Sequence, residues 1–194
     1  QAHEIREHAA DRLAELMKAQ LAELNFLDVE FEIAVQRMEE PGADGSDDVE
    51  FLISTNPGES LKPLGRIASG GELSRVMLAI KTVLADQDAI ETVIFDEIDT
   101  GISGRTAQKV SEKLALIGRS RQVICITHLA QLASMADSHY CIEKRAVDGS
   151  TQTGIRLLDE QESVEELARI LGGAQITDAV IDNAREMKKL AQKF

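Results

Sequence analysis

The chain has 194 residues, of which 43% are apolar and 28% charged, a composition typical of a soluble globular protein with one core. Aromatic residues make up only 3% and the formal net charge is −13, which argues against base-stacking platforms for single strands and against general affinity for nucleic acid backbones. No stretch is apolar for the length of a membrane span, and the first residues lack the features of a signal peptide, so we expect a cytoplasmic protein without a membrane partner.

The first two dozen residues predict an amphipathic helix. Apolar side chains recur every three or four residues with charged residues between them: Ile5, Ala9, Leu13, Met17, Leu21 and Leu24. The pattern is regular from the start and has no capping residue, which suits the end of a coiled coil cut from a longer protein, although a plain surface helix fits nearly as well. Asn25 is a suitable stop, and we assign residues 1–25 to the end of a coiled coil.

A hairpin is predicted next, because the apolar period changes to two. Alternate residues from Val29 to Val35 and from Val49 to Thr55 share a face. Residues 39–48 lie between the two strands, and their acidic, Gly- and Pro-containing sequence predicts a mobile loop without chemistry.

Ser69-Gly70-Gly71-Glu72 opens a second helical pattern. Glycines at a helix start let backbone N–H groups approach an anion at the positive end of the helix dipole, and the Ser69 hydroxyl can donate to the same anion. The alternative is an ordinary helix start with Ser69 as its N-cap, and the motif alone does not decide between the two. Arg75 and Lys81, further along this helix, are candidates for carrying the loop's position to the coiled coil or to DNA.

An apolar run from Val93 ends in Asp96-Glu97-Ile98-Asp99. The run predicts a strand buried on both faces, with Asp96 and Glu97 at its carboxyl end, where open parallel sheets bind ligands. Asp96 is suited to a magnesium ion, and Glu97 to orienting or deprotonating a water that attacks a phosphoryl group. A solvated turn with ordinary acids is the competing interpretation.

A helix over residues 105–117 and a strand from Gln122 to Thr127 follow, which predicts a parallel crossover. Parallel neighbours end at the same edge of a sheet, so His128 is expected near Asp96 and Glu97, although a histidine after a strand is more often a capping or surface residue. The cysteines Cys125 and Cys141 both lie in apolar runs and are predicted to be reduced core thiols.

The last part of the chain predicts packing elements. A hairpin pairs residues 140–146 with 154–158, and a capping box at 163–166 opens a helix that ends at Gly172-Gly173. A final helix starts near Thr177.

Three of these motifs together resemble, in order and spacing, the ATP-binding heads of the ABC superfamily. Ser69–Glu72 is similar to the signature loop, Val93–Asp99 to the Walker B strand and His128 to the switch histidine. Within the superfamily, residues 68–75 and 95–104 resemble the SMC-related ATPases of bacterial double-strand break repair. The resemblance implies an α/β fold: the C-terminal lobe of an ABC/SMC-type head over residues 26–160, with a parallel sheet core, flanking helices and β-hairpins. Residues 161–194 would be helices packed on that head.

The resemblance also implies roles. Such proteins hydrolyse ATP with Mg²⁺ between two heads, so Ser69, Gly70, Gly71 and Glu72 would form the loop that caps the γ-phosphate bound by a second head of a homodimer. Asp96 would support magnesium, Glu97 would be the general base, and His128 would contact the γ-phosphate. Asp99 and Ser103, in the loop after the Walker B strand, would also belong to the nucleotide site. The full-length protein would act on DNA double-strand ends.

Two departures from the family pattern matter. The chain contains no G-x-x-x-x-G-K-[ST] motif, since the nearest glycines, Gly65 and Gly70, are followed by Gly71-Glu72. In the resembled family the phosphate-cradling loop belongs to the N-terminal part of the chain, so the resemblance implies an N-terminal head lobe of the same protein, and this chain alone is expected to be inactive. Ser103 stands where many heads have an aspartate, which leaves its subunit contact open.

Two other functions remain open. The first is a DNA-tethering structural module in which nucleotide-gated head closure holds DNA ends. The second is an ATPase subunit of a transporter, which Asp99 and the coiled-coil-like first helix make the weaker alternative.

Overall fold

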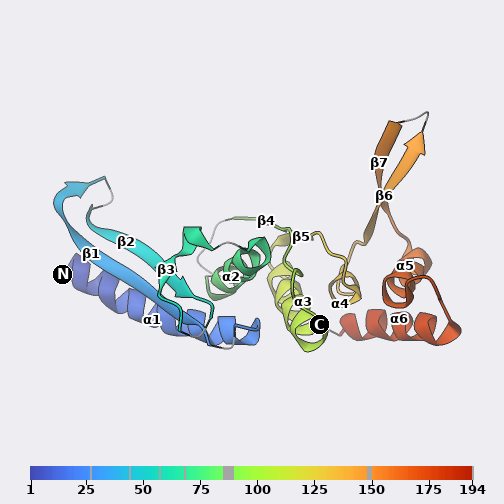
Figure 1. Ribbon diagram of the computed structural model, residues 1–194, viewed down its shortest axis with the longest axis horizontal. Helices are drawn as coiled ribbons and strands as arrows, with labels where there is room; N and C mark the ends of the chain where they lie inside the picture. Colours follow the sequence, from blue (N-terminus) through green and yellow to red (C-terminus); the bar gives the residue numbers. More distant parts are fainter. Residues whose placement is uncertain are drawn as a thin grey trace. The chain divides into compact units, whose positions relative to one another are not determined.

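The computed structural model describes residues 1–26, 28–43, 45–56, 58–67, 69–84, 90–147 and 150–193, with the backbone alone at 145–147 (Figure 1). The chain forms two compact units, Gln1–Ile126 and Thr127–Phe194. The predicted division into 1–25, 26–160 and 161–194 stays a prediction. None of the helices in the described ranges has the length and apolarity that a membrane crossing requires.

The first unit begins with a long helix, α1 (Ala2–Glu23), whose end is capped in the manner the sequence predicts. Asn25 adopts the left-handed conformation with φ +73°, and the Phe26 N–H donates to the Leu21 carbonyl at 3.2 Å. This is the Schellman arrangement, in which a residue with positive φ ends the helix and turns the next side chain back toward it. Leu21, Leu24 and Phe26 are consequently buried.

The buried face of α1 differs from the prediction in its first half. Ala10 and Ala14 are buried, whereas Ile5 is 64% exposed and Ala9 is also exposed. Helix α1 packs on β1 (Glu30–Gly42), and the predicted face holds from Met17 onward.

The predicted mobile loop at 39–48 is wrong. Strands β1 and β2 (Gly45–Ser54) continue through this segment, pairing Arg37 with Asp47 and Gly42 with Gly45. The reason is a tertiary anchor: Asp47 accepts hydrogen bonds from Arg6 Nη1 at 2.5 Å and pairs with His3 Nδ1 at 2.7 Å, both on α1. The hydrogen bond from Arg6 is the main cause that lowers the pKa of Asp47.

A short strand, β3 (Lys62–Pro63), pairs with β2, and the 3-10 helix η1 (Leu64–Arg66) follows it.

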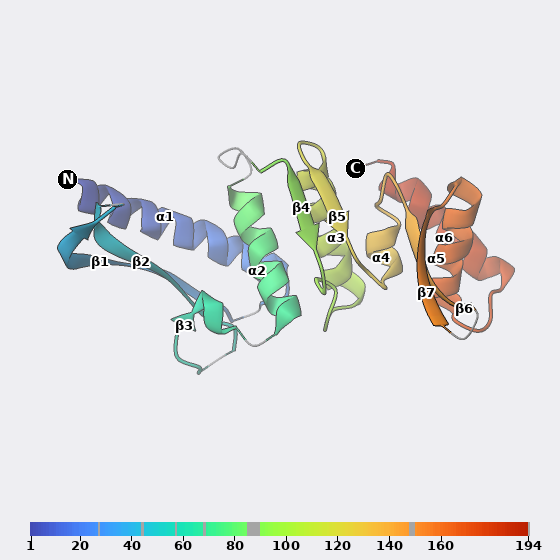
Figure 2. The same cartoon turned by 90° about the horizontal axis from the view of Figure 1, so that it is seen from above.

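The parallel crossover is confirmed. Strand β4 (Thr92–Phe95), helix α3 (Gly104–Gly118) and strand β5 (Gln122–Cys125) follow α2 (Gly70–Val83), and β4 pairs in parallel with β5. Figure 2 shows the two strands side by side with α3 behind them. The prediction that both faces of the strand are buried is wrong, because Ile94 is 65% and Ile124 44% exposed. Helices of the first unit cover one face of this sheet, and no described element of that unit covers the other.

The second unit contains α4 (Ala130–Ala133), the hairpin of β6 (Tyr140–Val147) and β7 (Ser150–Leu157), α5 (Glu160–Gly172) and α6 (Asp178–Ala191). Its core is an apolar cluster of helix side chains that includes Leu167 and Ala184, both 0% exposed. The predicted capping box at 163–166 is wrong: the capping box of α5 lies four residues earlier, with Asp159 as N-cap and Glu162 as its partner. Ser163 is instead buried and lies 2.8 Å from His139 Nδ1.

We expect His139 to make the second unit less stable in mild acid. Burial, together with nearby Lys188, lowers the pKa of His139 below its ordinary 6.5, while Glu166 acts in the opposite direction. As pH falls below 6.5, His139 binds a proton in the unfolded chain but not yet in the folded chain. The free energy of unfolding therefore decreases with falling pH, until the pH passes the lower pKa of the folded state. Denaturant midpoints measured from pH 8 to pH 5 should fall, and the fall should be smaller in His139→Gln. The exposed His8 on α1 is the matched control, since His8→Gln should retain the pH dependence of the unchanged chain.

Candidate active site

The loop after β4 presents two carboxylates in a fixed turn. Asp96 and Glu97 are both exposed, and the Glu97 N–H donates to Asp96 Oδ1 at 2.9 Å. Thr100 N–H donates to the Glu97 carbonyl at 3.0 Å, which closes the turn. Glu97 has a φ of +55°, a left-handed conformation that costs a residue with a Cβ about 1–2 kcal/mol. A carboxylate at this sheet edge is therefore held in a backbone conformation that its neighbours must enforce.

The start of α2 packs directly on this turn. Ser69 is the N-cap, and its hydroxyl accepts a hydrogen bond from the Glu72 N–H at 3.4 Å, so the ordinary capping role that the sequence left open is present. A Cβ placed on Gly71 would lie 2.8 Å from Thr100 Cβ, and one on Gly70 would lie 2.3 Å from Glu97 Oε2. The two glycines thus let the helix start reach the carboxylate of the same chain.

The other predicted site residues lie around this turn or outside the unit. Asp99 is buried at 3% exposure, while Ser103 is exposed as the N-cap of α3 without a side-chain capping bond. His128 is exposed and belongs to the second unit. Its predicted place beside Asp96 and Glu97 therefore stays a prediction. Ala68, the first residue of the signature-like phrase, lies outside the described residues.

Two residues that hold the turn were not singled out for this role from the sequence. Ser74 Oγ donates to the Asp96 carbonyl at 2.8 Å, and Arg75 Nη1 donates to the Thr100 carbonyl, also at 2.8 Å. The available signal was weak: an arginine followed by the apolar residues Val76 and Met77 in a helix is a candidate for burial with its charge directed at backbone carbonyls.

The cysteine next to the site is unsuited to nucleophilic chemistry. Cys125 is a half-buried free thiol at the end of β5, and burial, followed by the charges of Asp99 and Asp96, raises its pKa to about 12. Cys141 is also a free thiol, but it lies half-buried on the β6–β7 hairpin and outside a core, so its predicted core position is wrong.

A metal ion at this turn would need ligands beyond the chain's own side chains. In the described ranges, no group of three or more His, Cys, Asp and Glu residues could hold a metal ion. Magnesium, however, is commonly held by one or two carboxylates, waters and substrate phosphates, and the exposed Asp96 fits that mode. The glycine-lined helix start beside it fits an anion.

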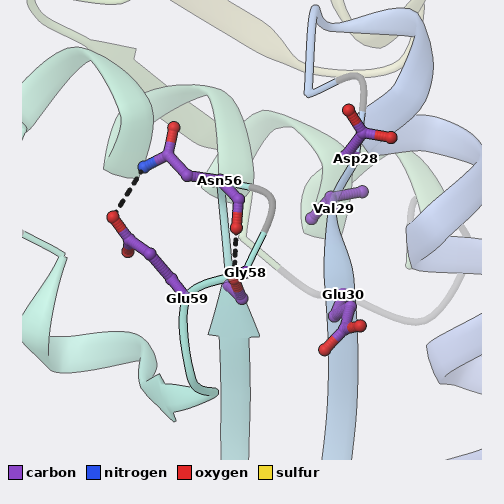
Figure 3. A pocket seen from close by; sticks show the side chains of 7 residues that line it. Asp28, Val29, Glu30, Asn56, Gly58 and Glu59 are labelled. Carbon is purple, nitrogen blue, oxygen red and sulfur yellow. Dashed lines mark hydrogen bonds between the residues drawn. The ribbon is translucent and has the colours of Figure 1, made fainter.

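A separate depression of about 410 Å³ lies where β1 and the end of β2 meet the following loop. Its described lining includes the carboxylates of Asp28, Glu30 and Glu59 and no basic side chain (Figure 3). The Asn56 amide donates to Glu59 at 3.2 Å. This acidic lining repels phosphate, so we assign the candidate active site to the turn at 96–100.

Comparison of the sequence with known proteins identifies a family. A protein of Halalkalibacterium halodurans named DNA repair protein RecN is 44% identical to the chain over 191 residues, which is 96% of this chain. RecN of Deinococcus radiodurans is 44% identical over 182 residues. The chain belongs to the RecN family. No protein-family model matches it.

The RecN relatives are longer than the chain. It spans 34% of the Halalkalibacterium halodurans RecN and 34% of the Bacillus subtilis RecN, to which it is 44% identical over 195 residues. The matched part is the C-terminal region of RecN.

Solved structures show the fold of this chain. An Smc head domain from Pyrococcus yayanosii matches with a TM-score of 0.57 at 21% identity, covering 84% of this chain and 29% of that one. An SMC ATPase from work on ATP-driven dimerization and DNA-stimulated activation matches with a TM-score of 0.51 at 18% identity, covering 87% of this chain and 97% of that one. The predicted α/β architecture of an SMC-type head is therefore confirmed.

Proposed function

We propose that this chain is one lobe of an SMC-type head that hydrolyses ATP in DNA double-strand break repair. The observation that carries the proposal is the carboxylate of Glu97, held at the end of a parallel strand against the glycine-led start of α2. A carboxylate at the end of a parallel strand can orient and deprotonate a water that attacks a phosphoryl group, and the RecN-family membership of the chain supports this role.

Each residue of the site has a proposed role. Glu97 orients the attacking water and takes its proton, and Asp96 contributes one oxygen to Mg²⁺, which neutralises phosphate charge when it is bound. Ser69, Gly70 and Gly71 present backbone N–H groups and a hydroxyl to the γ-phosphate of ATP bound on a second head. Glu72, Asp99 and Ser103 belong to the loops that bind the nucleotide, and we assign His128, from its motif alone, to contact with the γ-phosphate.

We further propose that the chain needs another lobe of its own protein. It lacks the lysine loop that cradles phosphates, and its parallel sheet exposes one apolar face. Ile94 and Ile124 are neighbours in the β4–β5 register, and Ile126, 48% exposed, continues their row. Parallel sheets are normally covered on both faces, so an N-terminal lobe packed on this row would bury it.

DNA would be bound by the full-length protein. A chain with a formal charge of −13 repels the phosphate backbone, so double-strand ends are expected to contact other parts of the molecule. A protein that acts on DNA would be located in the bacterial cytoplasm, at the nucleoid.

ATP turnover tests this proposal directly. The chain alone should show no magnesium-dependent turnover, whereas a mixture with the separately expressed remainder of the protein should hydrolyse ATP. A mixture carrying Glu97→Gln is the control and should be inactive. Turnover by the chain alone would contradict the need for a second lobe, and turnover by the Glu97→Gln mixture would contradict the assignment of the base. Association without turnover in either mixture would favour a nucleotide-gated tether.

A further inference from the structure

Arg75 is a buried charge in the middle of the first unit. It lies on α2 with 7% of its surface exposed, and burial lowers the pKa of its guanidinium, an effect that Glu72 partly offsets. Its Nη1 donates to the Thr100 carbonyl at 2.8 Å, while its Nε has no hydrogen-bond partner among the described residues. Burying a guanidinium with incomplete hydrogen bonding costs free energy, so its contacts need an explanation beyond packing.

Arg75 and its neighbour Ser74 hold the two ends of the catalytic turn. Ser74 Oγ binds the carbonyl of Asp96, just before Glu97, and Arg75 binds the carbonyl of Thr100, whose N–H closes the turn on Glu97. Two consecutive residues of one helix therefore fix both sides of a residue with a φ of +55°. A strained conformation persists only where the surrounding contacts enforce it, and these two hydrogen bonds are such contacts.

The same guanidinium touches the end of α1. Arg75 Cζ lies 5.4 Å from the centre of the Phe26 ring, within the range of a cation–π contact. The Schellman cap at Asn25 sets the position of Phe26, and Lys113 of α3 binds Glu23 at 2.9 Å, so the end of α1 is fixed on the unit. A shift of α1 would move Phe26, and the contact would pass that shift to Arg75.

We propose that Arg75 is a positioning residue for Glu97 and that Phe26 couples it to the end of α1. The chain of contacts runs from the Phe26 ring to the guanidinium, from the guanidinium to the Thr100 carbonyl, and from Thr100 to the Glu97 turn. Movement of the long helix thereby changes how the carboxylate is presented. This inference rests on the proposed role of Glu97 in ATP hydrolysis.

Steady-state kinetics of the full-length protein test the proposal. Arg75→Met keeps the apolar stem and removes the donor, and should lower kcat about 10- to 100-fold with little change in the KM for ATP, because misplacing a catalytic group by about 1 Å can cost that much. Arg75→Lys should recover part of the loss, since it can still donate to Thr100. Phe26→Leu should lower kcat several-fold, and the double variant Phe26→Leu/Arg75→Met should be no slower than Arg75→Met alone, because both act through one contact.

The outcomes separate this proposal from the assignment of Glu97. If Glu97→Gln abolishes turnover while a folded Arg75→Met variant keeps the original kcat, the positioning role is overturned and the base remains. Losses that simply add in the double variant would overturn the coupling to α1. Should Arg75→Met fail to fold, Phe26→Leu decides, because leucine fills most of the ring's volume and an unchanged kcat would refute the coupling. Turnover that survives Glu97→Gln would remove the proposed function itself.

Discussion

Replacing Glu97 with glutamine is expected to reduce ATP turnover by the full-length protein about 10²- to 10⁴-fold while leaving ATP affinity unchanged. Glutamine has nearly the same shape as glutamate, and an amide oxygen cannot take the proton of an attacking water. Its backbone preference at φ +55° is similar, so the turn closed by Thr100 should persist. Only the step that needs the carboxylate is removed, which lowers kcat without changing nucleotide contacts.

Two measurements make this result specific. ATP binding by equilibrium titration should be equal in both proteins, and the denaturant midpoint should not move. Glu97→Asp is the informative companion, because it keeps the charge on a side chain one methylene shorter and should show turnover between the two. If Glu97→Gln lost ATP binding together with turnover, the carboxylate would be acting on nucleotide affinity and its assignment as a base would be wrong.

Local patterns in the sequence were sufficient for the elements that surround the site. Glycines followed by an apolar helical period predicted the start of α2, and the buried Val76, Leu78 and Ala79 confirm its inner face. An apolar run ending in acids predicted β4 and its turn. The prediction succeeded because the apolar residues that pair with β5 are also those that set the length of β4. The stop at Asn25 was predictable because few residue types tolerate positive φ.

Features that depend on distant partners could not be predicted in this way. The acidic segment at 39–48 reads as a loop, and it forms strands because Asp47 meets two basic side chains of α1 more than forty positions away in the chain. Ser163 fits a capping pattern, but His139 binds it and Asp159 takes the cap. Ile94 is exposed because no described element of the first unit covers its face of the sheet, and no local pattern encodes what packs on a strand.

The hydrogen bonds that hold the turn at 96–100 also depend on distant partners. Nothing in the spacing of Ser74 and Arg75 indicates that they donate to the carbonyls of Asp96 and Thr100. The glycine pair before them is visible in the sequence, however, and in the structure each glycine has different close neighbours: a Glu97 side-chain oxygen for Gly70, and Thr100 and the Glu97 carbonyl for Gly71. That difference leads to a second large expected effect.

Changing Gly71 to alanine should both destabilise the first unit and impair turnover. The new Cβ would lie 2.8 Å from Thr100 Cβ and 2.9 Å from the Glu97 carbonyl, so α2 or the backbone of the turn at 96–100 must move. Overpacking of this kind costs about 1–3 kcal/mol. Alanine's better helix propensity returns at most about 1 kcal/mol. The net result should be a lower denaturant midpoint and, because the Glu97 turn is displaced, a kcat at least about tenfold lower.

Gly70 and Gly118 are the controls, because an added Cβ would meet a flexible side chain at Gly70 and nothing within 4 Å at Gly118. In Gly70→Ala the close neighbour is Glu97 Oε2, the end of a flexible side chain, so stability should change little while turnover falls because the carboxylate is pushed aside. In Gly118→Ala nothing lies within 4 Å of the new Cβ, so this variant should be fully active and no less stable. Equal behaviour of Gly71→Ala and Gly118→Ala would mean that α2 does not rest on the turn. Loss of turnover in Gly70→Ala at unchanged stability is the expected result, and it would show that Gly70 leaves the space that the Glu97 carboxylate needs.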